Sequence, residues 1–200
     1  MILAAAFLIA IFIGLARGGS LKRLANLPIR WGWIALVAFG LQIYLIYFPE
    51  PSNEGLFSPR VVVLTASYVM LFAVLWENRA LPGVWLIGLG LAANFAVMLL
   101  NGGYMPITAQ ALQQVGHSRT IVGIGSGARV SGTKDIVLPQ EATIAWWLSD
   151  IFVIPPPFPI PSVFSVGDAF ISLGMLWLIQ RAMLDSRLKL EENSMTKGTT

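Results

Sequence analysis

The chain has 200 residues, of which 56% are hydrophobic and only 12% are charged, and its mean hydropathy is +0.73. This apolar content exceeds what a soluble domain of this length can bury, so the composition predicts an integral membrane protein. The absence of cysteine excludes disulfides and thiolate sites, and the single histidine, His117, excludes a multi-histidine metal cage. We therefore expect no metal, no cofactor and no nucleic-acid partner.

Five apolar runs approach the ~20 helical residues that are needed to cross about 30 Å of hydrocarbon. They lie near residues 2–15, 31–48, 61–76, 84–100 and 168–183. The stretch at 101–167 is too polar and too interrupted to be one span, and we expect it on the outer face. The predicted fold is an all-α membrane protein, with a five-span transmembrane helix bundle and an outer loop cap forming one domain over residues 1–189. A polar tail follows at 190–200.

Basic residues gather after the first, third and fifth runs. They are Arg17, Lys22, Arg23, Arg30, Arg79, Arg181, Arg187, Lys189 and Lys197, whereas the other loops hold only Arg60, Arg119, Arg129 and Lys134. The positive-inside rule makes the first group cytoplasmic, which predicts a bacterial cytoplasmic-membrane protein with its N-terminus outside and its C-terminus inside. No basic residue precedes the first run, so we expect it to be retained as an anchor.

The outer loop contains two segments that favour short helices. Residues 108–115 read as an amphipathic helix, and residues 139–154 read as a second helix lying at the membrane interface, with Trp146 and Trp147 as interfacial aromatics. The glycine-rich G-I-G-S-G at 123–127 is not a dinucleotide-binding pattern and indicates a flexible loop. Arg129, Lys134 and Asp135 are interpreted as solvated charges, with a lipid phosphate as an alternative partner of Arg129.

Two carboxylates, Asp150 and Asp168, bracket the apolar, proline-rich segment D-I-F-V-I-P-P-P-F-P-I-P-S-V-F-S-V-G-D. Ionisable groups are costly at membrane depth, so such a pair points to a functional site. Two nearby carboxyl groups can share a proton, one activating water and the other polarising a carbonyl, as in aspartic peptidases. Taken singly, we favour a structural role for each residue, with Asp168 capping the last helix and Asp150 facing water at the interface, whereas for the pair we favour the functional role.

Asparagines Asn94 and Asn101 lie seven residues apart on one face of the fourth apolar run. For Asn94 we favour packing by amide hydrogen bonds against a neighbouring helix. For Asn101 the same packing role and a hydrogen-bonding role beside the aspartates stay open. Gln42, Thr65 and Ser67 are interpreted as packing polar residues.

The segment from L-S-D-I-F to F-S-V-G-D-A-F-I-S-L-G resembles the C-terminal part of signal peptidase II, the lipoprotein signal peptidase. The resemblance implies that Asp150 and Asp168 are catalytic, and that Asn101 and Ser165 orient the pair or bind substrate. Ser165 stands where that family has asparagine. Over its full length the chain also resembles uncharacterised bacterial five-span families, which carry N-x-x-x-M-P and a D…F-P…F-S-x-G-D ending.

Three functions are therefore predicted as alternatives. The favoured one is an accessory or scaffold component of a membrane assembly, whose partners are the lipid bilayer and other membrane subunits. The second is an aspartic peptidase that cleaves a lipidated peptide at the outer leaflet. The third, a small transporter or lipid-binding protein, has less support because the spans carry almost no charge.

Overall fold

The computed structural model describes residues 2–47, 58–116, 121–122 and 127–184. Five long helices occupy the five apolar runs, and their ends fall within two residues of the expected bounds. They are α1 (Ile2–Ala16), α3 (Gly32–Tyr47), α4 (Pro59–Glu77), α5 (Val84–Leu100) and α7 (Val166–Leu184), with a short α2 (Leu21–Ala25) after α1. His117, Arg119, residues 123–126 of the glycine-rich loop and the polar tail at 190–200 lie outside the described residues.

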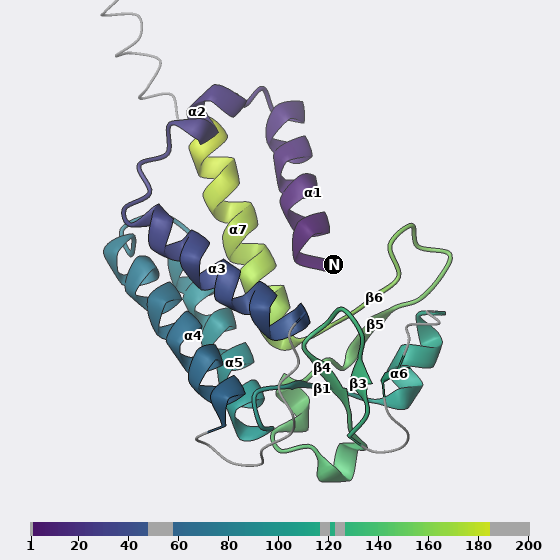
Figure 1. The fold of residues 1–200 in the computed structure, drawn as a ribbon. Helices are drawn as coiled ribbons and strands as arrows, with labels where there is room; N and C mark the ends of the chain where they lie inside the picture. The colour runs from purple at the N-terminus through teal and green to yellow at the C-terminus, as the bar shows by residue number, and fades with distance from the viewer. Residues whose placement is uncertain (1, 48–57, 117–120, 123–126, 185–200) are drawn as a thin grey trace, which may run out of the picture.

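Successive long helices alternate in direction (Figure 1). The starts of α1 and α7 and the end of α5 all contact the cap, which comprises the described residues between 101 and 165. At the opposite end, Ser20 N donates to Met183 O at 3.2 Å, and Arg30 N donates to Asn78 Oδ1 at 2.9 Å. We call this opposite end the basic end, because it holds Arg17, Lys22, Arg23, Arg30, Arg79 and Arg181.

Among the described residues, α4 is the one helix both long and apolar enough to cross a membrane, while α1, α3 and α5 are apolar but shorter. Every long helix also exposes large apolar side chains. They include Phe7, Leu8 and Phe12 on α1, Trp33, Leu36 and Phe39 on α3, Val62, Val69 and Trp76 on α4, Trp85 and Leu89 on α5, and Leu173 and Trp177 on α7. Each helix therefore has an apolar side that the rest of the described protein leaves uncovered.

Helices α5 and α7 approach each other almost backbone to backbone. A Cβ added at Gly90 would lie 2.3 Å from Gly167 O, and one added at Gly174 would lie 2.6 Å from Gly83 O. The two contacts recur at the same seven-residue spacing on both helices, as antiparallel packing of small residues requires. The glycines thus hold the first half of α7 against the first half of α5.

The cap contains a four-stranded sheet that the sequence did not predict. Its strands are β1 (Met105–Ile107), β2 (Ile121–Val122), β3 (Arg129–Val130) and β4 (Asp135–Val137), in the order β1-β4-β3-β2. Strand β1 pairs with β4 in parallel, and β3 pairs antiparallel with both β4 and β2. A hairpin of β5 (Phe152–Ile154) and β6 (Ser162–Phe164) extends from this region (Figure 1).

The shorter of the two predicted cap helices is present as α6 (Ala109–Gln114), which begins after Thr108. The Thr108 hydroxyl accepts a hydrogen bond from Ala111 N at 3.2 Å, which satisfies an amide of the first turn. Ala111 and Leu112 pack in a core with residues of β1, β3 and β4. This small core gives the cap its own packed interior.

The predicted interfacial helix at 139–154 is wrong. The segment instead forms two short 3₁₀ helices, η1 (Gln140–Ala142) and η2 (Trp146–Leu148), followed by the start of β5. Ala145 has a φ of 53°, in the left-handed region that an α-helix cannot continue through. The following Ile-Phe-Val-Ile run favours a strand because it is β-branched and aromatic, and Pro155 closes it.

The glycine contact between α5 and α7 can be tested by adding one methyl group. We expect Gly90→Ala to lower the free energy of unfolding by about 1–3 kcal/mol, because the new Cβ meets the α7 backbone. Thermal and denaturant unfolding in detergent micelles would measure the change. Gly40→Ala on α3 is the control, because no atom lies within 4 Å of its added Cβ. The control should be neutral or more stable by about 0.5–1 kcal/mol, and equal losses in both variants would contradict the close approach.

Candidate functional site

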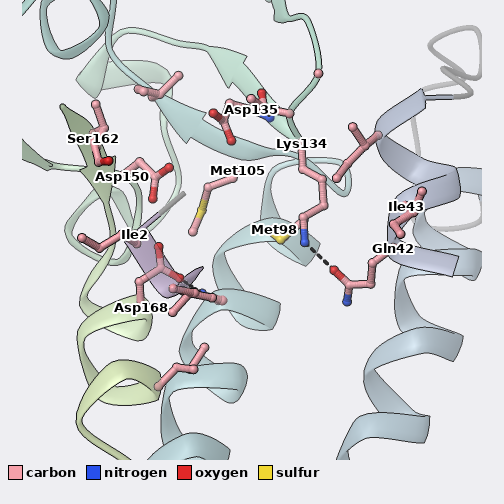
Figure 2. A pocket seen from close by; sticks show the side chains of 18 of the residues that line it. Ile2, Gln42, Ile43, Met98, Met105, Lys134, Asp135, Asp150, Ser162 and Asp168 are labelled. Carbon is pink, nitrogen blue, oxygen red and sulfur yellow. Dashed lines mark hydrogen bonds between the residues drawn. The ribbon is translucent and has the colours of Figure 1, made fainter. Parts of the chain in front are cut away.

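A cavity of about 650 Å³ lies where the helix bundle meets the cap (Figure 2). Its wall is mostly apolar and includes Ile2, Ile43, Met98 and Met105. The polar residues that line it include Gln42, Tyr68, Asn94, Lys134, Asp135, Asp150, Ser162 and Asp168. An apolar cavity of this size with a few convergent polar groups is typical of a small-ligand or peptide site.

Asp150 reaches the cavity from the cap. Its backbone forms a bridge beside β1, with Asp150 N donating to Pro106 O at 3.1 Å. The residue is 8% exposed, and its Oδ1 is buried without a hydrogen-bond partner in the described part of the chain. Burial raises the pKa of this carboxyl well above its ordinary value, and the neighbouring charges of Asp135 and Asp168 raise it further. The site thus favours the protonated acid at Asp150.

Asp168 reaches the same cavity from the first turn of α7, where it forms a capping box with Ser165. The Ser165 hydroxyl accepts a hydrogen bond from Asp168 N at 3.0 Å, and Asp168 Oδ2 accepts one from Ser165 N at 3.4 Å. The predicted capping role is therefore observed, and it coexists with a place in the cavity wall. The two aspartates line one cavity although they belong to different layers of the fold (Figure 2).

Asn94 on α5 completes the setting of Asp168. Its Nδ2 donates to Asp168 Oδ1 at 2.9 Å, and its Oδ1 accepts from the Ser165 hydroxyl at 2.7 Å. A Cβ on Gly167 would lie 2.0 Å from Asn94 Oδ1, so only glycine lets the asparagine approach at this point. The amide hydrogen bonds expected of Asn94 to a neighbouring helix are thus present, and they also orient the carboxyl group of Asp168.

Lys134 supplies a positive charge to the cavity from the turn between β3 and β4. It is partly buried and donates a hydrogen bond to Gln42 Oε1 on α3 (Figure 2). Burial lowers the pKa of Lys134, while the charges of Asp135, Asp168 and Asp150 oppose that change. The prediction of Lys134 and Asp135 as solvated charges is therefore wrong. Their role depends on the parallel pairing of β4 with β1, for which the sequence carries no local signal.

Asn101 does not line the cavity, contrary to the role that the resemblance implied. It ends α5, where its Nδ2 donates to Val97 O at 2.7 Å and to Ile144 O at 3.0 Å, and its Oδ1 accepts from Ile144 N at 3.1 Å. These bonds attach the segment between η1 and η2 to the end of α5. Asn94 lies on the same face of α5, two turns earlier, and it holds the position beside Asp168 instead.

No metal centre is evident in the ranges that the structure describes, since no group of three or more histidine, aspartate or glutamate side chains there is arranged to hold an ion. The polar groups that line the cavity are carboxyl, amide, hydroxyl and ammonium groups.

The raised pKa of Asp150 predicts a pH-dependent stability. Between the unfolded value near 3.8 and the higher folded value, the folded protein keeps a proton that the unfolded chain releases. The free energy of unfolding should therefore fall as the pH rises through this window, and level off once the folded carboxyl ionises. Asp150→Asn should remove this part of the pH dependence in thermal unfolding measured from pH 4 to pH 9. Parallel pH profiles for the wild type and the variant would contradict it.

Comparison with known proteins places most of the chain in one family. Residues 26–180 match DUF5317, a family of unknown function, and this range includes both aspartates, Asn94 and Lys134. No curated protein and no solved structure matches the chain. Because the matched range covers well over half of its length, the chain belongs to the family of unknown function DUF5317.

Proposed function

We propose that this protein is a multi-pass membrane protein in which Asp150 and Asp168 form the acid–base pair of an aspartic peptidase. The observation that carries the proposal is that the two carboxyl groups line one cavity but differ in their hydrogen bonds and in their surroundings. Asp150 is buried, its Oδ1 has no hydrogen-bond partner among the described residues, and burial favours its protonated form, whereas Asp168 accepts hydrogen bonds from Asn94 and Ser165.

The membrane placement is supported by three features. Each long helix has an uncovered apolar side, successive helices alternate in direction, and the basic end concentrates positive charge. We infer that the basic end is cytoplasmic and the cap is outside. Helices α1, α3 and α5 have 15 to 17 residues, or about 22–26 Å at 1.5 Å per residue. A bilayer accommodates such lengths by thinning locally.

In the proposed reaction, Asp168 acts as the base and Asp150 as the acid. Asp168 takes a proton from a water molecule, whose oxygen attacks the carbonyl carbon of the scissile bond. Asp150 gives its proton to the carbonyl oxygen as the tetrahedral intermediate forms. Collapse of the intermediate breaks the carbon–nitrogen bond, and the amine leaves with a proton from Asp168 while one hydroxyl of the intermediate returns a proton to Asp150 and the new carboxyl group forms. A carboxylate has about four lone-pair positions, so Asp168 can accept this proton while its present donors stay bonded.

The apolar wall suggests the substrate class. Side chains from α1, α3, α4, α5 and α7 all contribute to the cavity, which suits the apolar residues of a peptide anchored in the membrane. Lys134, across the cavity from Asp168 in Figure 2, provides a donor for a carbonyl group of such a peptide.

Non-catalytic binding is the second candidate, and it covers both the lipid-binding and the accessory roles expected from the sequence. The hydrogen bond from Lys134 to Gln42 holds an ammonium group at the cavity wall. This position favours non-catalytic binding, because a cation there also suits the headgroup of an amphiphile. The exposed aromatic side chains on the helices suit a partner subunit as well as lipid.

The membrane topology can be measured with single cysteines, because the chain has none of its own. We expect Glu141→Cys in the cap to react with a membrane-impermeant maleimide on intact cells. Arg79→Cys at the basic end should react only after the membrane is made permeable. Both positions are exposed, so equal reactivity before permeabilisation would contradict the proposed orientation.

The catalytic pair can be tested by a cleavage assay on purified protein with a panel of acylated and membrane-anchored peptides. We expect the wild type to cleave at least one of them, and Asp150→Asn and Asp168→Asn each to lose about 10²–10⁴-fold in rate. Glu141→Gln, an exposed acid away from the cavity, is the control and should keep the wild-type rate. A wild type that binds these peptides without cleaving any of them would favour the second candidate.

A further inference from the structure

The tip of the β5–β6 hairpin is an exposed apolar loop. It consists of residues 155–161, P-P-P-F-P-I-P, which we call the proline tip. Phe158 is 50% exposed and Ile160 is 36% exposed, and no residue between Asp150 and Asp168 carries a charge. An exposed loop is ordinarily polar, so this composition calls for an environment other than water.

The proline tip also has almost no free backbone donors. Proline has no amide hydrogen, so only Phe158 and Ile160 among its seven residues can donate from the main chain. Phe158 N already donates to Pro155 O at 3.3 Å, and Ile160 O accepts from the Ser162 hydroxyl at 3.1 Å. An irregular loop is normally excluded from lipid because its unsatisfied amide groups are costly there. This loop avoids most of the part of that cost that comes from backbone N–H groups.

The base of the hairpin fixes where the tip lies. Val153 and Val163 pack against the core of the cap, and β6 contacts α1. On the other side of the hairpin, Phe152 stacks on Phe164 with ring centroids 5.3 Å apart, and Phe152 remains 44% exposed. In Figure 1 the hairpin extends away from the sheet, and its tip lies level with the start of α1. The exposed apolar tip of the hairpin thus lies at the level of the start of α1.

We propose that the proline tip inserts into the lipid of the outer leaflet and anchors the cap to the bilayer. This inference rests on the membrane placement proposed above, but not on the peptidase activity. Pro161, Ser162 and Val163, at the foot of the tip, belong to the wall of the cavity. Insertion of the tip therefore holds that wall at the depth of the lipid, where a membrane-anchored substrate approaches.

Fluorescence quenching in vesicles tests the insertion. Single cysteines at Phe158, Leu36 and Glu141 are labelled with the fluorophore NBD, and the full-length protein is reconstituted into vesicles of phosphatidylcholine and phosphatidylglycerol. Leu36 on α3 is 73% exposed and reports the membrane placement, whereas Glu141 reports the water-facing part of the cap. We expect blue-shifted emission and quenching by doxyl-labelled lipid at positions 158 and 36, and quenching by aqueous iodide at position 141. Ile160→Cys, labelled in the same way, should repeat the result at 158.

The possible outcomes separate the two proposals. If positions 158 and 160 respond to iodide while position 36 responds to doxyl lipid, the helices lie in the bilayer but the tip does not, and insertion is overturned. If position 36 also responds only to iodide, the membrane placement itself fails and insertion fails with it. Quenching by doxyl lipid in vesicles that contain no other protein excludes a partner protein as the cover of the tip.

Discussion

The contact between α5 and α7 is the constraint on which the site depends. Because Gly90 and Gly167 have no side chains, the start of α7 can lie directly on the backbone of α5. That separation brings Asn94 within hydrogen-bond distance of both Ser165 and Asp168, and the three residues form a closed polar unit. A larger residue in the contact would separate the helices and move the carboxyl group of Asp168 away from its donors.

The cap positions its polar residues over the cavity by strand pairing and a side-chain hydrogen bond, not by close helix packing. Its sheet is built from strands of two or three residues, yet it places Asp150 and Lys134 over the same cavity. Asp150 is positioned by main-chain pairing next to β1, and Lys134 by its bond to Gln42. Apolar surroundings strengthen the hydrogen bonds and electrostatic interactions of such polar groups. The polarity of the cavity therefore comes from a few side chains, and among them burial raises the pKa of Asp150 and lowers the pKa of Lys134.

The long helices could be predicted from the sequence because they depend on long apolar segments. The sheet of the cap could not, because it depends on pairing between strands that are far apart in the chain. The helical runs could be located because each contains enough consecutive apolar residues to exceed any strand. Asp150 and Asp168 were found because carboxylates are rare in such a chain. The sheet could not be found, since strands as short as β3 show no alternation, and with it the place of Lys134 was lost. Asn94 and Asn101 share a helix face, so only the position of α7 could show which of them meets Asp168.

The division of the aspartates between two layers has a mechanical consequence. Asp168 moves with the helices, whereas Asp150 moves with the cap, so the separation of the two carboxyl groups is set by how firmly the cap is seated. In the proposed membrane placement, the bilayer surrounds the helices along their length but reaches the cap only through the inserted proline tip. A change in lipid packing would then alter the geometry of the pair directly, which makes the site responsive to the physical state of the membrane as well as to its ligand.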